Sequence, residues 1–308
     1  MPKKIVVEIA EGLGNQLFMY AHSYALSKRL GCELQIDNVS GFSKKKNKLR
    51  SHQKYMLDKF NISQNLADSN STYENSFKRI KKKYELFFEK FKNKKKFIIE
   101  KNIKINNNKT ALPIIIPDNS NLSNLIYVQG NFENEKYFHS FKDDLIKMYK
   151  PLKRFINYDN ETIYQLKNTN SVSIHVRKNK YSDQPHEIIK NERLVKSENF
   201  TNDLLDYIKK SITYFEKKIN NPTFFIWSND IDSITKHFKG KNFVYVKGND
   251  VINDFNLFSY AKHFIVGGST FHWWGAYLNT NPNKICVFPS TLNPSGNPNF
   301  YPNHWKRI

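Results

Sequence analysis

Two segments of this 308-residue chain combine glycine with small polar residues in a way that suits phosphate binding. Gly12–Gln16, with the sequence Gly-Leu-Gly-Asn-Gln, follows the apolar run Ile5–Ile9 and precedes apolar residues at helical spacing. Gly267–Thr270, Gly-Gly-Ser-Thr, follows apolar residues in the same way. Glycine lets the backbone approach a ligand closely, and the unpaired N–H groups that begin a helix attract anions. Each segment is therefore predicted to be an anion-binding turn between a strand and a helix.

The first segment departs from two phosphate-binding motifs. A Walker-type loop ends in Gly-Lys-Ser/Thr, which Asn15-Gln16-Leu17 does not supply. A dinucleotide fingerprint has its third glycine where Leu17 stands, although Asp37 lies at a suitable separation for a ribose contact. A turn that binds no ligand is a third interpretation, so this segment alone leaves its ligand open.

Basic residues mark the end of another apolar run. His175, Arg177 and Lys178 lie at or just after the end of a predicted strand, Val172–Val176. Ligands of open parallel sheets bind at the carboxyl ends of strands. There Arg177 would meet a phosphate through its planar fork and Lys178 as a point charge. The alternative is that His175-Val176-Arg177 only ends the strand and binds no ligand.

Acidic residues follow the predicted strand Phe224–Trp227. Asp230 could accept a hydrogen bond from a base or a ribose, and with Asp232 it forms an Asp-x-Asp pattern that could hold a metal ion. Either carboxylate could instead cap the next helix. We expect Asp232 to cap the helix and Asp230 to bind a ligand.

The composition is that of a folded, strongly basic protein. Aromatic residues make up 15% of the chain and the formal net charge is +21. The window 42–109 holds 20 Lys and Arg against 6 Asp and Glu, so 20 minus 6 places +14 there. A nucleic-acid site, an anionic membrane contact and a solvated face are three interpretations. No zinc-finger, KH or RRM signature accompanies the charge, so we expect no nucleic-acid partner.

The compartment is predicted from cysteine usage and hydropathy. Cys32 and Cys286 each lie in an apolar stretch, which favours buried free thiols over a disulfide or a zinc site. No apolar run reaches the roughly 18–20 residues of a membrane span, and the first apolar run is too short for a signal sequence. We expect a cytoplasmic protein, with peripheral contact at the inner face of the membrane as an option.

Strand and helix patterns alternate along the whole chain, which predicts a parallel α/β architecture. Lys150–Asn170 is the expected boundary between an N-terminal lobe, 1–150, and a C-terminal lobe, 151–308, with a Lys-rich insertion at about 42–109. Strands are expected at 5–9, 33–36, 97–100, 112–116, 125–129, 172–176, 224–227, 243–246, 263–266 and 284–288. Helices are expected from residue 17 on and at 136–148, 200–218, 231–238, 254–261 and 271–278. Trp273 and Trp274 are interpreted as core residues.

Together these segments resemble glycosyltransferase family 11, the α-1,2-fucosyltransferases. That family carries four blocks in this order: Gly-Leu-Gly-Asn-Gln, His-x-Arg-Arg-Gly-Asp-Tyr, Phe-x-Phe/Trp-Ser-Asp-Asp and Ser-Ser/Thr-Phe/Tyr-Ser-Trp-Trp-Gly/Ala-Ala-Tyr-Leu. They correspond here to Gly12–Gln16, His175–Tyr181, Trp227–Asp230 and Ser269–Leu278, and Tyr127–Phe138 is similar to a middle block. The resemblance covers nearly the whole chain, and the last block and the order are its most specific features.

The resemblance implies a GT-B-like fold of two Rossmann-like lobes, with a nucleotide-sugar cleft between them. It also implies GDP-fucose as donor, inversion at the anomeric carbon and no required metal or other cofactor. Residues implied near the donor phosphates or in the GDP site are Gly14, Asn15, His175, Arg177, Ser228, Asp230, Ser269, Thr270 and Phe271. The expected activity is transfer of fucose to a hydroxyl, O2 of a galactose above all, of a surface-glycan precursor that can be lipid-linked.

The chain departs from the family after Arg177. Lys178-Asn179-Lys180 stands where the pattern has Arg-Gly-Asp, so one cation loses its fork and one carboxylate becomes a cation. Asp183 and Glu187 are possible replacements for that carboxylate, and with His186 they are candidates for the base that an inverting mechanism needs. We assign catalysis to Arg177, His175 and Asp183. A shifted donor or acceptor, reduced activity, or a polybasic membrane-binding or nucleic-acid-binding α/β protein are the alternatives.

Overall fold

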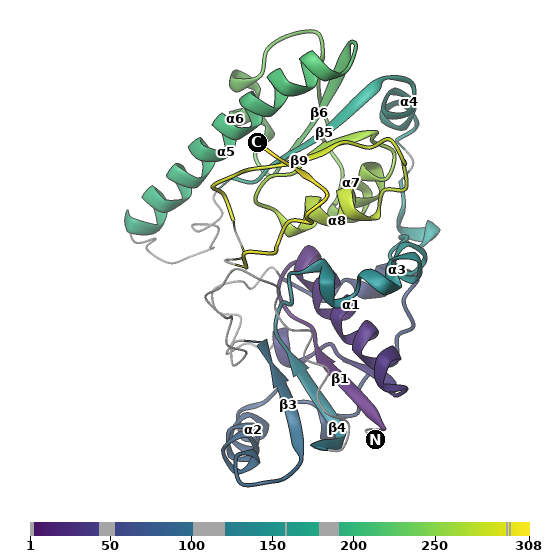
Figure 1. Ribbon diagram of the computed structural model, residues 1–308, viewed down its shortest axis with the longest axis vertical. Coiled ribbons are helices and arrows are strands. Elements are labelled where there is room, and N and C mark those ends of the chain that lie inside the picture. The colour runs from purple at the N-terminus through teal and green to yellow at the C-terminus, as the bar shows by residue number, and fades with distance from the viewer. Residues whose placement is uncertain are drawn as a thin grey trace. The chain divides into compact units, whose positions relative to one another are not determined.

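The computed structural model describes residues 3–42, 53–100, 121–157, 159–178, 191–293, 295 and 297–308 (Figure 1). The chain divides into two compact units, Met1–Tyr149 and Lys150–Ile308. Each unit is built on one parallel sheet, which confirms the α/β prediction. The expected strand at 112–116 and the segment 179–190 lie outside the described residues.

The sheet of the first unit has the strand order β2-β1-β4-β3, and every pair in it is parallel. The strands are β1 (Lys4–Glu8), β2 (Glu33–Asp37), β3 (Lys95–Ile99) and β4 (Leu122–Gln129). The helices are α1 (Leu13–Leu30), α2 (Ser76–Glu89) and α3 (Lys142–Met148).

Alternation along the strands gives this sheet two different faces. Ile5 and Val7 are fully buried, and α1 contacts β1 and β2 (Figure 1). The other face carries Val6 and Tyr127, and Leu86 of α2 packs against their cluster. Helices thus cover both faces, as a parallel sheet requires.

The sheet of the second unit has the order β10-β9-β8-β5-β6-β7, also with all pairs parallel. Its strands are β5 (Asn170–Val176), β6 (Pro222–Ser228), β7 (Phe243–Tyr245), β8 (His263–Ile265), β9 (Cys286–Phe288) and β10 (Lys306–Arg307). The chain adds β6 and β7 on one side of β5, then crosses to add β8, β9 and β10 on the other side. This is the Rossmann strand order, with its switch point between β5 and β8.

The described residues of the second unit form the helices α4 (Asn160–Asn168), α5 (Asn191–Lys218), α6 (Ile231–Ile234), α7 (Val251–Phe258) and α8 (Thr270–Leu278). Leu204 and Ile208 of α5 pack on Ile174 and Ile226 of the sheet. Phe264 and His272 make an aromatic contact on the opposite face, where α8 lies. The expected linker 150–170 therefore contains a helix of the second unit, α4, which contacts β5.

Several predicted elements differ in extent. The predicted helix at 136–148 is regular only over Lys142–Met148, because two 3-10 turns precede it and Phe138 between them is not helical (φ −134°, ψ 4°). The helix expected at 200–218 begins at Asn191 instead. The helix expected at 231–238 ends at Ile234 and continues as a 3-10 turn.

The core predictions are confirmed for the tryptophans and in part for the cysteines. Trp273 and Trp274 are fully buried, and the Trp273 indole donates to the Phe300 carbonyl at 2.9 Å. Both cysteines are free thiols, but only Cys286 is buried, whereas Cys32 is half-buried. Across the described ranges, no helix combines the length and the apolar character that crossing a bilayer demands.

Candidate functional site

The switch point of the second unit brings two predicted segments to neighbouring strand ends. β5 and β8 pair in parallel, with Ile174 opposite Ile265. Arg177 follows β5 directly, and the Gly-Gly-Ser segment, 267–269, follows β8. Ligands of open α/β sheets bind outside the carboxyl ends of strands at such a point. His175, Arg177 and Ser269–Phe271 therefore belong to one edge of one sheet.

His175 lies among aromatic rings at this edge. Its ring centroid is 5.8 Å from that of Phe271, 6.0 Å from His272 and 6.5 Å from Phe258. Burial, and then the charge of Arg177, lower the pKa of His175 to about 3. Its enclosed Nδ1 has no hydrogen-bond partner among the residues that the structure describes. His175 is therefore neutral at physiological pH and suited to hydrogen bonding, not to carrying charge.

The two glycines after β8 are explained by close packing. A Cβ on Gly267 would lie 2.5 Å from Leu204 Cδ1, and one on Gly268 would lie 2.4 Å from Phe200 Cζ. Both neighbours belong to α5, so the glycines let this long helix pack against the turn. This resembles the role of a glycine at a close helix–strand contact in dinucleotide-binding folds.

Ser269 and Thr270 mark the start of helix α8. Ser269 occupies the N-cap position of α8, but its side chain makes no capping hydrogen bond, and Thr270 is the first helical residue. The first turn of α8 contains no acidic residue that would repel an anion. Phe271 follows in that turn and is half-buried against Phe255 and Phe258, with ring centroids 5.8 and 5.2 Å away.

The predicted cap of α6 needs correction, whereas the ligand role expected of Asp230 stays a prediction. Asp230, not Asp232, is the N-cap residue of α6, and its carboxylate accepts from Ser233 N at 3.4 Å. The Asp232 side chain is 90% exposed and forms an ion pair with Lys247 at 2.8 Å. Asp232 fails as a cap because the helix begins at Ile231, two residues earlier than that role requires.

Lys178 is paired inside the site. Its Nζ donates to Asp230 Oδ2 at 2.9 Å and to Ser233 Oγ at 2.6 Å. The hydrogen bond from Lys178 first, and that between Ser233 and Asp230 second, lower the pKa of Asp230. Ser228 accepts from Asp230 N at 3.0 Å, so Ser228 and Asp230 both help to shape the end of β6.

The sequence interpretation missed one carboxyl group, Asp254. Burial first, and the neighbouring Asp250 second, raise the pKa of Asp254 to about 7. The polar side chain of Trp227, near the end of β6, lowers the pKa of Asp254 in part. The indole N–H of Trp227 makes no hydrogen bond of ordinary geometry with a described residue. The sequence predicts that a helix starts at Asp254, and so does not identify this residue as a buried side chain inside the helix. The N-cap is instead Asp250, which accepts from Ile252 N and Asn253 N at 2.9 Å.

The first unit places its motif at the carboxyl end of β1, which pairs in parallel with β4. Gly12 is the N-cap of α1, so Gly14 and Asn15 lie in the first helical turn and not in the preceding turn. Asn15 Nδ2 donates to the Glu11 carboxylate. Gln16 Nε2 donates to Glu11 O and Lys54 O, each at 2.8 Å. The polar side chains of this motif thus hold the turn together.

Two non-glycine residues near the carboxyl ends of β1 and β4 have left-handed backbone conformations. Glu11 follows β1 with φ 64°, and Phe132 follows β4 with φ 51°. Such positions cost about 1–3 kcal/mol and cluster at functional sites, where the surrounding structure holds them. Phe132 is held by a stacked contact with His22, whose ring centroid lies 3.6 Å away. Both residues mark this edge of the sheet as a candidate ligand site.

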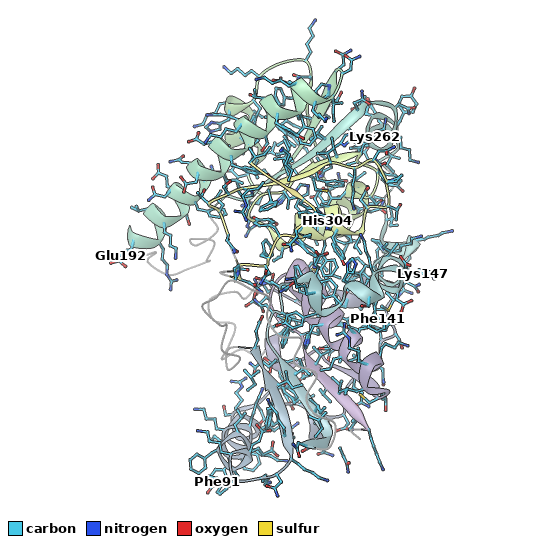
Figure 2. All side chains as sticks on the ribbon, in the orientation of Figure 1. Phe91, Phe141, Lys147, Glu192, Lys262 and His304 are labelled. Carbon is cyan, nitrogen blue, oxygen red and sulfur yellow. The ribbon has the colours of Figure 1, made fainter. Side chains whose placement is uncertain are left out.

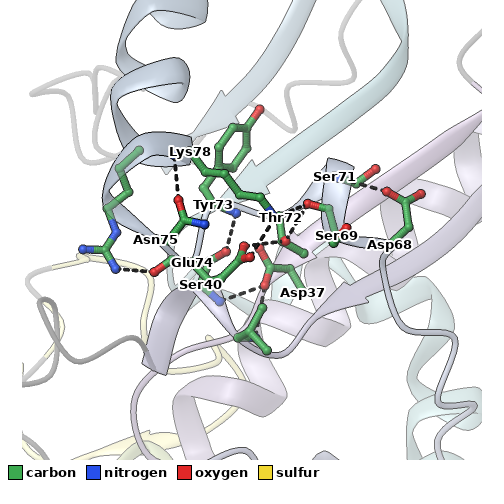
Figure 3. A network of polar contacts seen from close by, with 12 residues as sticks. Asp37, Ser40, Asp68, Ser69, Ser71, Thr72, Tyr73, Glu74, Asn75 and Lys78 are labelled. Carbon is green, nitrogen blue, oxygen red and sulfur yellow. Dashed lines mark hydrogen bonds and ion pairs between the residues drawn. The ribbon is translucent and has the colours of Figure 1, made fainter.

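Asp37 does not have the exposure that a ribose contact needs. It is fully buried, and it accepts from Tyr127 Oη at 2.6 Å and from Ser40 N at 2.9 Å. Ser40 Oγ in turn accepts from Tyr73 N at 2.7 Å, which links Asp37 to the loop before α2 (Figure 3). Asp37 therefore has a structural role.

The remaining site predictions concern metal ions and the general base. Within the described ranges, His, Cys, Asp and Glu side chains do not gather in groups of three or more that could hold a metal ion. Asp183, Lys180, His186 and Glu187 lie outside the described residues, and their roles stay predictions.

Comparison with known proteins finds a glycosyltransferase family and relatives that are glycosyltransferases. The model of "Glycosyl transferase family 11" matches residues 4–299. An Escherichia coli α-1,2-colitosyltransferase is 28% identical, covering 93% of this chain and 91% of its own. The E. coli O-antigen biosynthesis glycosyltransferase WbnK is 26% identical, covering 91% and 92%.

Among solved structures, the fold is similar to that of Arabidopsis thaliana FUT1 in a mutant form bound to GDP. The TM-score is 0.50 at 10% identity, and the match covers 93% of this chain and 70% of that one. At this identity the match bears on the fold alone, which is GT-B-like. Because the family model spans nearly the whole sequence, the chain belongs to glycosyl transferase family 11.

Proposed function

We propose that this protein is an inverting fucosyltransferase that transfers fucose from GDP-fucose to a hydroxyl, O2 of a galactose above all, of a surface-glycan precursor. The observation that carries the proposal is the shared sheet edge of Arg177 and the start of α8 at the Rossmann switch point. A guanidinium and a helix N-terminus together suit a diphosphate. The GDP in the similar FUT1 structure supports the choice of nucleotide.

In this proposal, Arg177 stabilises the charge that grows on the leaving diphosphate. A preorganised cation aimed at developing charge lowers the barrier without a metal ion, so we propose that no metal is required. Neutral His175 donates or accepts a hydrogen bond beside it. Ser228, Asp230, Ser269, Thr270 and Phe271 would form the rest of the GDP site, with Gly14 and Asn15 near the phosphates.

The acceptor hydroxyl must lose a proton in an inverting displacement. Asp183 is the proposed base on the spacing of the family motif. Asp254 is the second candidate, because a carboxyl with a pKa near 7 can exchange a proton at physiological pH. The two candidates are distinguished by replacing each with asparagine and comparing the pH dependence of kcat.

A second donor is favoured by one observation, the 28% identity to an α-1,2-colitosyltransferase over most of both chains. Colitose is fucose without its 3-hydroxyl, so a site for one sugar can accept the other with few changes. The reversal of charge at Lys180 is a further reason to test the donor. WbnK supports an O-antigen type of acceptor, and hence a cytoplasmic reaction on a lipid-linked precursor.

Thermal shift and turnover together test the proposal. A ligand that binds only the folded state at 100 times its Kd stabilises it by about 2.7 kcal/mol. GDP and GDP-fucose should raise the Tm, and GDP-fucose should give the faster turnover of the two donors. Faster turnover of GDP-colitose would assign the second donor. Two results would contradict both proposed donors. One is stabilisation by UDP-sugars or NAD but not by GDP, and the other is salt-dependent DNA binding with no nucleotide binding.

A further inference from the structure

Helix α2 is packed with its polar side inward. Lys82 is buried, and its Nζ donates to Gln129 Oε1 at 2.9 Å and pairs with Glu8 Oε2 at 3.3 Å. Glu85, one turn further on, accepts from Tyr73 Oη at 2.6 Å. Leu86 adds an apolar contact, but hydrogen bonds and charge hold much of this inner side to the sheet, unlike an ordinary amphipathic helix on a core.

The outer side of α2 carries large apolar residues. They recur every three or four positions and so share one helical face. Phe77 is 79% exposed, Tyr84 66% and Phe91, just past the helix, 74%. Figure 2 labels Phe91 beside this helix. The exposed members of this aromatic stripe are Phe77, Ile80, Tyr84, Phe87, Phe88 and Phe91. A contiguous apolar face of this kind marks an interaction surface.

The charge beside the aromatic stripe has one sign. Exposed cations are Lys81, Lys83, Lys90, Lys92, Lys94 and Lys95. The acidic residues of the described segment 74–100 are half-buried and face inward partners. Glu74 pairs with Lys78 at 2.7 Å, Glu85 pairs with Lys96 at 2.8 Å, and Glu89 accepts from Phe97 N at 2.7 Å. The outer face is therefore both aromatic and cationic.

We propose that α2 docks this protein on an anionic lipid bilayer. Aromatic rings on one face and lysines at its margins are the pattern by which helices lie in the headgroup region, parallel to the membrane plane. Lysines near such a surface are attracted by anionic lipids. A second copy of this chain is a poorer occupant, because it would bring one set of lysines against another.

A cavity of about 460 Å³ beside α2 offers a place for a headgroup phosphate. Arg79, Lys83 and Lys90 line it, together with Phe87 of the aromatic stripe. The carboxylate of Glu8 also lines it and is paired with Lys82. Cations and an apolar edge thus meet along one flank of the helix. The start of the helix is fixed as well, because Asn75 Oδ1 accepts from Lys78 N at 2.9 Å. The stripe is therefore presented on a helix that is capped at its start.

Flotation with vesicles tests the proposal on the full-length protein. Vesicles of phosphatidylcholine and phosphatidylglycerol in equal amounts should bind the protein, and vesicles of phosphatidylcholine alone should bind it much more weakly. Replacing Phe77, Tyr84 and Phe91 by serine should lower the partition coefficient at least 10-fold, on the order expected for three lost aromatic anchors. Tyr164→Ser removes an aromatic of equal exposure, 67%, from α4 and should change nothing.

The lysines have a matched control as well. Replacing Lys81, Lys83 and Lys90 by glutamine should weaken binding to anionic vesicles. Replacing the exposed Lys210, Lys217 and Lys218 of α5 removes the same charge and should leave it near wild type. Circular dichroism should give unchanged melting for the serine variant, because the replaced rings are exposed.

Two results would overturn the proposal. One is equal vesicle binding by the wild type and the serine variant. The other is a lipid-free dimer in light scattering that the serine substitutions abolish, which would assign the stripe to self-association. Vesicle binding needs no nucleotide, so its outcome is independent of the donor test.

Discussion

Lys178 Nζ lies 2.9 Å from Asp230 Oδ2, and this ion pair joins the ends of β5 and β6. The Lys178 cation is thereby committed to a protein carboxylate, whereas the family pattern has a second arginine at this position. In our proposal, Arg177 is therefore the principal cation of the motif for a donor phosphate. This ion pair predicts the order in which substitutions of the basic residues after β5 should reduce activity.

Arg177→Ala should reduce kcat by roughly 10²–10³, the scale of losing one preorganised charge-stabilising donor. Arg177→Lys should also be poor, because an ammonium does not reproduce the planar fork. Lys178→Ala should cost less, and Lys180→Ala least. Steady-state kinetics with GDP-fucose would measure the order, and near-normal turnover of Arg177→Ala beside an inactive Lys180→Ala would reverse our assignment.

Asp254→Asn should separate stability from activity. The pKa of the folded state is raised from 3.8 to about 7, so the folded protein binds more protons than the unfolded chain between these values. Stability contributed by the protonated group is therefore lost as pH rises toward 7. The asparagine variant should melt higher than wild type at pH 8 and similarly at pH 4. If Asp254 transfers a proton, kcat should fall about 10²-fold or more; unchanged kcat would leave Asp183 as the base.

Turnover should persist in excess EDTA. Arg177 and the helix N-termini carry the diphosphate charge in our proposal, so chelation removes nothing that the reaction uses. The measurement is the initial rate with and without chelator, with Mg²⁺ and Mn²⁺ added back. Activity that disappears and returns with a metal ion would make Asp230 and Asp232 ligands again.

His22 should make the first unit sensitive to acid. Burial lowers the pKa of its ring from 6.5 to about 3, while the unfolded chain titrates near 6.5. Below pH 6.5 the unfolded state gains a proton that the folded state does not, so stability falls by up to about 1.4 kcal/mol per pH unit. His22→Phe keeps the ring stacked on Phe132 and should flatten this slope in denaturant titrations between pH 6.5 and 4. An unchanged slope would mean that other groups dominate.

Gly268→Ala should destabilise the second unit by about 1–3 kcal/mol, because its methyl group would overlap Phe200. Gly12→Ala is the matched control, since its φ is −78° and an added Cβ meets no atom within 4 Å among the described residues. Its cost should stay below about 1 kcal/mol. Thermal melts compare the two variants. Equal losses of stability would show that packing against α5 is not the reason why residue 268 is a glycine.

The fold was largely predictable because strand and helix periodicities dominate the chain. The strand ends that carry Arg177, Asp230 and Ser269 follow from apolar runs alone. The sequence could not reveal contacts made across the fold, such as Phe200 against Gly268 or the burial that shifts Asp254. It also could not show that α2 packs its charged side inward, because periodicity identifies an apolar face but not what covers it.

The pairing of β1 with β4 sets the order in which the first unit can form. Lys4 lies opposite Leu125, and β4 separates β1 from β3 in the sheet. During synthesis β1 therefore waits for most of the unit to be translated before its central partner exists. Such long-range pairing is slow and leaves apolar edges exposed meanwhile. A chain that stops before β4 would lack the middle of its sheet and should be captured by chaperones instead of folding.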